Sequence, residues 1–224
     1  MKAARLLSNS TCTSREIYTI LKKALFSSAN RKDLQKLHSL LIIGLPKSLI
    51  FSGKLISKYS QFKDPNSCLL VFRENSQADN AYLWNTIIRA MTHNGLYSKA
   101  LEFYVEMRKL EMKPDCYTFP SVINACGSLV DLERGRVVHE DVMELGFGYD
   151  LFINNALIGM YSRCNKLGRA REVFDGMPHR DIVSWISLMS GYTSTGYFKE
   201  ALEIYYQLRM DGLVPIVLHF RVLC

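Results

Sequence analysis

The side chains that usually carry out catalysis are scattered along this 224-residue sequence and do not form motifs. One of the five histidines stands directly before a carboxylate, as His139-Glu140, but an H-x-E zinc motif needs a residue between the two, and the chain has no C-x-x-C pair. It also has no glycine-rich phosphate loop, no G-x-S-x-G turn and no constellation of paired carboxylates. We therefore predict that the chain is not an enzyme and that it binds no metal, cofactor or small-molecule substrate.

The six cysteines give no sign of a metal site or of a disulfide framework. They follow no regular spacing along the chain, at positions 12, 68, 116, 126, 164 and 224. Isolated cysteines of this kind are most often small apolar residues of a protein core. We expect that role for them here.

The charge balance offers a weak indication of the partner. The chain has 28 Lys and Arg against 21 Asp and Glu, a net charge of +7, and a pI near 9.1. Basic side chains that neutralise phosphates release counterions, so a polyanion is one partner that this charge would suit. A solvated basic surface explains the charge equally well. The longest apolar run, residues 40–45, is far shorter than the ~20 residues that span a bilayer, so we expect no membrane association.

An internal repeat determines where any functional side chain must lie. Shifting the sequence by 101 positions aligns residues 81–114 with 182–215, with nine identities that include Trp84/Trp185 and Ala100/Ala201. A shift of 102 positions aligns residues 49–72 with 151–174. A period of this length exceeds one solenoid unit, so it should divide into smaller units.

A shorter pattern divides the period into helical hairpins. An Ala is followed by an aromatic residue four positions later and by Met or Leu three positions after that, as in Ala100-Tyr104-Met107, Ala170-Phe174-Met177 and Ala201-Tyr205-Leu208. These offsets place the three side chains on one face of a helix, where we expect them to form the core. A turn residue lies five positions before each Ala: Gly95, Asn165 and Gly196. Each unit is therefore predicted to be a helix, a turn and a helix, and stacked units form an all-α solenoid.

The predicted boundaries divide nearly the whole chain into such units. They run over residues 14–48, 49–80, 81–115, 116–150, 151–181 and 182–216, with a leading segment 1–13 and a tail 217–224.

At this point the sequence resembles the pentatricopeptide repeat family of plants. The residues that carry the resemblance include the runs Trp84-Asn85-Thr86-Ile87-Ile88, Ala100-Leu101-Glu102 and Lys113-Pro114-Asp115. Unit lengths of 35, 35 and 31 residues are similar to the subclass built from P, L and S triplets. In those terms 14–48 and 116–150 resemble L units, 49–80 and 151–181 S units, and 81–115 and 182–216 P units, the first and last of the six being degenerate. The resemblance implies an all-α fold, a right-handed α-solenoid superhelix of stacked helix-turn-helix repeats.

The resemblance also implies which side chains would read RNA. In this family the fifth and last residues of a repeat contact one base, and these positions hold Asn85 with Asp115 and Asn155 with Asp181. Tyr82 and Phe152 occupy the position that stacks on the base. An Asn with an Asp favours uracil in this family. Spacing alone would favour a turn residue and a helix cap for each pair, but the pair recurs in two units at the same register.

Three features limit which bases the array could read. The degenerate P unit has Ile186 and Ile216 at the reading positions, so we expect it to specify no base. Pro120 occupies the fifth position of its L unit, which is normal for that type. The tail 217–224 does not continue the pattern, and neither the E-type extensions nor a deaminase-like domain follows. We therefore expect a truncated or partial chain.

The resemblance implies a sequence-specific module for single-stranded organellar RNA. It would specify C-to-U editing or other transcript processing by recruiting editing-complex proteins or a deaminase in trans. The first fifteen residues contain Lys2, Arg5 and Arg15 and no acid, the composition of an organellar transit peptide. We expect a mitochondrial location, with the chloroplast as the alternative. A protein-binding helical scaffold and a non-functional truncated product are the competing interpretations.

Overall fold

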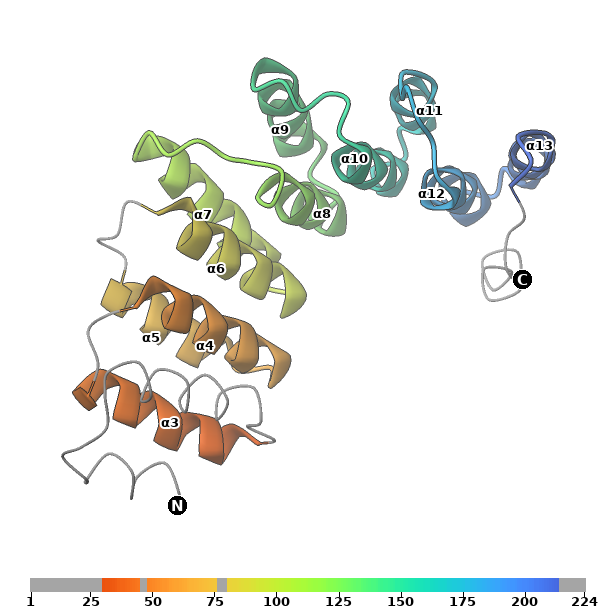
Figure 1. The fold of residues 1–224 in the computed structure, drawn as a ribbon. Coiled ribbons are helices and arrows are strands. Elements are labelled where there is room, and N and C mark those ends of the chain that lie inside the picture. The colour runs from red at the N-terminus through yellow and green to blue at the C-terminus, as the bar shows by residue number, and fades with distance from the viewer. Residues whose placement is uncertain (1–29, 45–47, 76–79, 214–224) are drawn as a thin grey trace. The chain divides into compact units, whose positions relative to one another are not determined.

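The computed structural model describes residues 30–44, 48–75 and 80–213, and every regular element in these ranges is an α-helix (Figure 1). The predicted all-α chain of helical hairpins is therefore confirmed, whereas the right-handed superhelix and the typed repeat boundaries stay predictions. The leading segment 1–13 and the tail 217–224 lie outside the described residues. The described helices are α3 (Arg31–Gly44), α4 (Leu49–Gln61), α5 (Pro65–Asn75), α6 (Ala81–His93), α7 (Tyr97–Lys109), α8 (Phe119–Leu129), α9 (Leu132–Glu144), α10 (Leu151–Arg163), α11 (Leu167–Asp175), α12 (Ile182–Ser194) and α13 (Phe198–Met210).

The chain forms two compact units, Met1–Leu96 and Tyr97–Cys224. In the first unit, α4 packs against α3, α5 and α6. In the second unit, α10 packs between α8 and α12, and these three helices form one row. Helices α9 and α11 form a second row beside it (Figure 1). The row α8, α10 and α12 consists of the first helices of successive hairpins, and each first helix therefore has one remaining face that the neighbouring helices do not cover.

The predicted turn residues have the backbone conformation that a tight helix–helix turn requires. Gly95, Asn165 and Gly196 all adopt positive φ, at 77°, 54° and 85°. In each case the N–H of the next residue bonds back to a carbonyl of the preceding helix, as in Leu96 to Met91 at 2.9 Å. This left-handed closure satisfies carbonyls that the helix end would otherwise leave unpaired.

One turn contains a residue that suits it poorly. Val130, which ends α8, has φ 56° and ψ 31°, and the N–H of Asp131 bonds to the carbonyl of Cys126 at 2.9 Å. A β-branched residue in the left-handed region is a genuine outlier, because its branched Cβ crowds the backbone. Neither a glycine nor an asparagine marks this turn in the sequence, so it was not predictable from turn residues.

The core is built from aromatic side chains that pass from one hairpin to the next. Phe72 on α5 meets Trp84 on α6 edge to face, with ring centroids 5.0 Å apart. The equivalent pair in the second unit, Phe174 on α11 and Trp185 on α12, has centroids 4.7 Å apart. All four rings are buried. This geometry is the favoured arrangement of aromatic pairs and fixes each hairpin on its neighbour.

The Ala-aromatic-Met pattern is core, as predicted, with one exception. Ala100, Tyr104 and Met107 are buried on α7, and the equivalent side chains of α11 are buried too. Tyr205 is partly exposed instead. It lies on α13, which is the last described helix of its unit.

Tyr104 also anchors a buried carboxylate. Its hydroxyl donates a hydrogen bond to Asp141 on α9, which in turn forms an ion pair with Arg108 of α7. Burial raises the pKa of Tyr104 to about 12, although Arg108 opposes the shift, so the hydroxyl keeps its proton. The ring of Tyr104 lies 6.5 Å from that of Phe119 on α8. One side chain thus connects α7 with both α8 and α9.

We predict that Tyr104→Ala lowers the free energy of unfolding by about 3 kcal/mol or more, because it leaves a cavity in the core. Tyr104→Phe keeps the ring and removes only the hydrogen bond to the carboxylate, which is worth about 1.5–3 kcal/mol. Urea denaturation of both variants measures the difference. If Tyr104→Ala left the stability unchanged, the ring would not be part of the core.

A second prediction concerns the strained turn. Val130→Asn should raise the free energy of unfolding by about 1 kcal/mol, because Asn tolerates the left-handed conformation that costs Val about 1–2 kcal/mol. Val137→Asn is the matched control, since Val137 is an exposed valine within α9. Thermal denaturation should separate the two variants. A gain of equal size in the control would show that strain at Val130 is not its source.

Candidate nucleic-acid interface

The uncovered face of α10 presents three side chains in a row. Phe152 is 73% exposed, Asn155 follows one helical turn later, and Arg163 is exposed at the end of the helix. Offsets of three and eleven residues are close to whole numbers of turns, so these side chains share one face. The other side chains of α10 are buried or partly buried. An aromatic ring, an amide and a guanidinium therefore stand in line.

The uncovered face of α6, in the first unit, presents the same types of side chain in the same order. Tyr82 is 45% exposed, Asn85 follows one turn later, and Arg89 is exposed one further turn on. Asn85 is 8% exposed, so its amide sits at the buried edge of this row. The ring of Tyr82 lies directly over Gly53 of α4, where an added Cβ would come within 2.3 Å of a ring carbon. Gly53 thus makes room for the ring, and this fifth-position residue offers no side chain of its own.

Asp181 holds the beginning of α12 and reaches the amide on α10. Its Oδ1 accepts from the backbone N–H of Ser184 at 2.8 Å and from the Ser184 hydroxyl at 2.9 Å, while its own N–H donates to that hydroxyl at 3.2 Å. This is a capping box, which satisfies otherwise orphaned N–H groups of the helix. The Nδ2 of Asn155 donates to the same Oδ1 at 3.3 Å. The structure therefore brings this predicted pair together.

The amide of Asn155 is only half satisfied. Its Oδ1 is buried and has no hydrogen-bond partner among the described residues. A buried acceptor without a donor costs free energy, and an incoming N–H group would recover that cost. Burial by itself favours the neutral form of Asp181, but the hydrogen bonds from Ser184 and Asn155 favour the carboxylate and lower its pKa. Asp181 is therefore an anion that orients the Asn155 amide.

Asp115 has the same local geometry just before α8. The backbone N–H of Thr118 donates to its Oδ1 at 3.0 Å, and its own N–H donates to the Thr118 hydroxyl at 3.0 Å. Its predicted partner Asn85 belongs to the first unit, whereas Asp115 belongs to the second. The helix-cap interpretation that the spacing allowed is thus correct for Asp181, whereas Asp115 holds the turn before Thr118, the N-cap of α8. It does not compete with a role in binding, because Asp181 both caps α12 and contacts Asn155.

The basic residues of the two rows, Arg89 and Arg163, were not among the residues predicted from the sequence. Arg163 donates from Nη2 to the Asn124 side chain of α8 at 2.8 Å. Arg89 stands one turn earlier on α6, and His93 occupies the position that corresponds to Arg163. Burial lowers the pKa of Arg163, which remains a strong base. Their helical phase relative to Asn155 and Asn85 was the signal that could have identified them.

Helix α12, the first helix of its hairpin, has neither an aromatic residue nor an amide at the corresponding positions. Val183 occupies the position of the aromatic residue, and Ile186, partly exposed, occupies that of the amide. Ile216, the other predicted non-reader, lies outside the described residues.

The part of the chain that the structure describes offers neither a reactive thiol nor a metal site. Cys68 and Cys126 are buried, and burial raises the pKa of each thiol to about 12, so neither is a reactive thiolate. Among the described residues, no cluster of three or more His, Cys, Asp or Glu side chains could hold a metal ion. None of the described helices is long and apolar enough to cross a membrane.

Family models match three stretches of the chain. The model described as the PPR repeat family matches residues 79–128, and the PPR repeat model matches residues 155–182 and 183–213. The row on α6 lies within the first of these stretches. Asn155 and Arg163 of the α10 row lie within the second, and Phe152 stands just before it.

Curated relatives come from Arabidopsis thaliana. Pentatricopeptide repeat-containing protein At3g03580 is 55% identical over 196 residues, which are 87% of this chain and 22% of that protein. Pentatricopeptide repeat-containing protein At3g12770 is 38% identical over 94% of this chain and 30% of its own length. The chain therefore spans less than a third of either relative.

Solved structures show the same fold. The crystal structure of the pentatricopeptide repeat protein PPR10 from maize has a TM-score of 0.69 and 19% identity, covering 94% of this chain and 31% of that one. PPR10 in complex with an 18-nt psaJ RNA element has a TM-score of 0.62 and 16% identity, covering 97% of this chain and 38% of that one.

The two roles of Asp181 can be separated by substitution. Asp181→Ala removes the cap and should lower the free energy of unfolding by about 1 kcal/mol. Asp181→Ser keeps an oxygen that can cap α12 and should stay close to the wild type, although it removes the carboxylate beside Asn155. Chemical denaturation measures both. Equal losses in the two variants would show that Asp181 stabilises the chain by something other than capping.

Proposed function

Because the chain belongs to the pentatricopeptide repeat family, we propose that the exposed rows of α6 and α10 bind single-stranded RNA, one base to each row. The observation that carries this proposal is the recurrence, on two first helices, of an exposed aromatic ring, an amide one turn later and an exposed guanidinium one or two turns further along. A cap or a turn would require only the polar residue. It would not require the ring or the arginine on the same face.

Each component of the row has a distinct physical role toward a nucleotide. A base stacks on the exposed ring of Tyr82 or Phe152, as bases stack on aromatic side chains in other single-strand binders. The amide of Asn85 or Asn155 bonds to the Watson–Crick edge of that base. The guanidinium of Arg89 or Arg163 neutralises a phosphate and releases its counterions.

The state of the Asn155 amide supports uracil as the base. Its Nδ2 donates to Asp181, and its Oδ1 still lacks a donor. Uracil offers an N–H at position 3 beside carbonyl oxygens, and this N–H would supply the missing hydrogen bond. If the row on α6 also reads uracil, the preferred ligand carries uracil at two positions. One loosely specified base, opposite the hairpin of α8 and α9, separates them.

The biological setting is part of the same proposal. We infer a plant organelle, since curated relatives include mitochondrial and chloroplastic proteins, and the mitochondrion is our first choice. The chain would direct C-to-U editing or other transcript processing by recruiting an enzyme in trans, and it would not catalyse the reaction itself. The likeness of the sequence to P, L and S triplets supports editing.

Base preference tests the proposal directly. Asn85→Thr should move the first uracil preference toward a purine, because the family resemblance implies that Thr with Asp favours guanine. One or two hydrogen bonds are at stake, so we expect a change of about 1–2 kcal/mol, or roughly tenfold in relative affinity. Selection from randomised RNA by the wild type and the variant measures it.

The matched control is Ile186→Thr, which makes a change at the same register position of α12, where no aromatic residue stands. It should leave the selected bases unchanged. Affinity for single-stranded RNA should also fall with rising salt, and duplex RNA should bind less well because its bases are paired. Identical selections by the wild type and Asn85→Thr would favour the protein-binding alternative.

A further inference from the structure

A histidine–tyrosine contact between neighbouring hairpins occurs once in each unit. In the first unit, Nδ1 of His38 on α3 lies 3.1 Å from the hydroxyl of Tyr59 on α4. In the second unit, Nδ1 of His139 on α9 lies 2.8 Å from the hydroxyl of Tyr161 on α10. The ring centroids are 5.7 Å and 5.6 Å apart, with nearly the same interplanar angle. The two units therefore contain two copies of one arrangement.

The two copies differ at the other ring nitrogen. Nε2 of His38 faces the carboxylate of Glu74 on α5 at 3.5 Å. The shift of 102 that aligns Phe72 with Phe174 aligns Glu74 with Gly176 (74 + 102 = 176). The second copy therefore has no side chain where the first supplies an acidic group.

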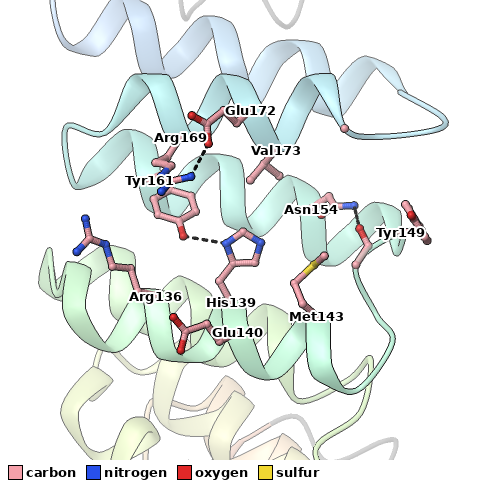
Figure 2. A pocket seen from close by; sticks show the side chains of 12 residues that line it. Arg136, His139, Glu140, Met143, Tyr149, Asn154, Tyr161, Arg169, Glu172 and Val173 are labelled. Carbon is pink, nitrogen blue, oxygen red and sulfur yellow. Dashed lines mark hydrogen bonds and ion pairs between the residues drawn. The ribbon is translucent and has the colours of Figure 1, made fainter.

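A cavity of about 490 Å³ occupies the corresponding place in the second unit. His139 projects into it from α9, Tyr161 from α10 and Val173 from α11, and Gly176 forms part of its wall (Figure 2). Figure 2 shows one nitrogen of the His139 ring directed at Tyr161 and the opposite edge of the ring directed at the cavity. The volume exceeds what a lone carboxylate needs and lies in the range of ligand pockets, about 300–1,000 Å³.

Charged groups of both signs surround the histidine. Arg136 and Glu140 of α9 and Arg169 and Glu172 of α11 line the same cavity, and Arg169 pairs with Glu172 at 2.6 Å (Figure 2). Burial lowers the pKa of His139, Arg169 lowers it further, and Glu140 opposes both. The imidazole is therefore neutral at neutral pH. A carboxylate near Nε2 would favour the imidazolium, because an opposite charge stabilises the charged form.

The rim of the cavity suits a polypeptide. Tyr149 is 78% exposed and Met143 is 59% exposed, and both line the cavity. Tyr and Met are enriched where proteins bind one another. A chain segment that placed an acidic side chain beside His139 would cover these two residues as well.

We propose that the His139 cavity binds an acidic side chain of a protein partner, which occupies the place that Glu74 fills beside His38. Asn154 and Tyr161 direct this face of α10 toward the cavity, whereas Phe152 and Asn155 lie on a different face of the helix. The cavity and the proposed RNA-binding row are therefore separate surfaces, and this inference does not depend on RNA binding.

Gly176→Glu tests the proposal without knowledge of the partner. Gly176 has φ −75°, and an added Cβ would lie 3.4 Å from the Glu172 carbonyl oxygen, an ordinary contact, so a side chain fits. Gly176→Glu should raise the pKa of His139, whereas Gly176→Gln, of equal size and without charge, should not. NMR titration of the His139 ring measures both. The same pKa in Gly176→Glu and Gly176→Gln would overturn the proposal.

Binding is tested with acetyl-Leu-Glu-Leu-amide, with acetyl-Leu-Gln-Leu-amide as the uncharged control and propionate as a free carboxylic acid. We expect the Glu peptide to shift the His139 resonances and to bind about tenfold more tightly than the Gln peptide, the factor that corresponds to a pKa change of one. Its affinity should rise as the pH falls through the pKa of His139, because the imidazolium is the form that pairs with a carboxylate. Gly176→Glu should abolish this binding.

Three results would contradict the proposal. Equal affinity for the two peptides would exclude a carboxylate site. Propionate that binds as tightly as the Glu peptide would make the occupant a small acid and not a polypeptide. A uridine-rich RNA that displaced the Glu peptide and shifted the His139 resonances would assign the cavity to phosphate.

Discussion

The surfaces of this protein depend on where each first helix begins, and capping side chains fix that point. Asn80 caps α6, Asp150 caps α10 and Asp181 caps α12, each by accepting a backbone N–H from the first turn. The spacing of the apolar side chains sets the rotational phase of the helix, so it determines which residues meet the neighbouring hairpins and which remain uncovered. On α10 that phase leaves Phe152, Asn155 and Arg163 on the open face. The start of α12 places Asp181 where its carboxylate accepts from the amide of Asn155 on α10.

The carboxylate of Asp181 both caps α12 and contacts the amide that we propose reads a base. Oδ1 accepts from both groups of Ser184 and from Nδ2 of Asn155, so the charge that stabilises the helix start also orients an amide on the adjacent helix. The arrangement requires a polar residue at the end of one repeat and a hydrogen-bonding side chain on the preceding first helix. The half-satisfied amide of Asn155 is the energetic consequence, since its Oδ1 stays without a donor among the described residues. An unpaired buried acceptor is tolerated more readily at a ligand-binding site than in a protein core.

Because the hairpins repeat, equivalent positions in the two units can be compared directly. The edge-to-face pairs Phe72–Trp84 and Phe174–Trp185 are nearly identical, as expected of contacts that hold hairpins together. Other equivalent positions have diverged. Glu74 completes the contacts of His38, whereas Gly176 leaves a cavity beside His139. The apolar contacts are thus shared between units, and the polar groups beside them distinguish one surface from the next.

The sequence by itself determined the elements and the core, because both follow from local periodicity. Positive φ at Gly95, Asn165 and Gly196 and the burial of Ala100, Tyr104 and Met107 follow from spacing along one helix or one turn. The positions of Asn155 and Asp181 were also predictable, but their hydrogen bond joins residues 26 apart in the chain, and only the packing of α10 against α12 creates it. The same reason applies to Gly53 beneath Tyr82, to Arg163 bound to Asn124 and to the cavity beside Gly176. Each depends on the distance between helices, which the contacts of the whole interface set and which no single stretch of sequence encodes.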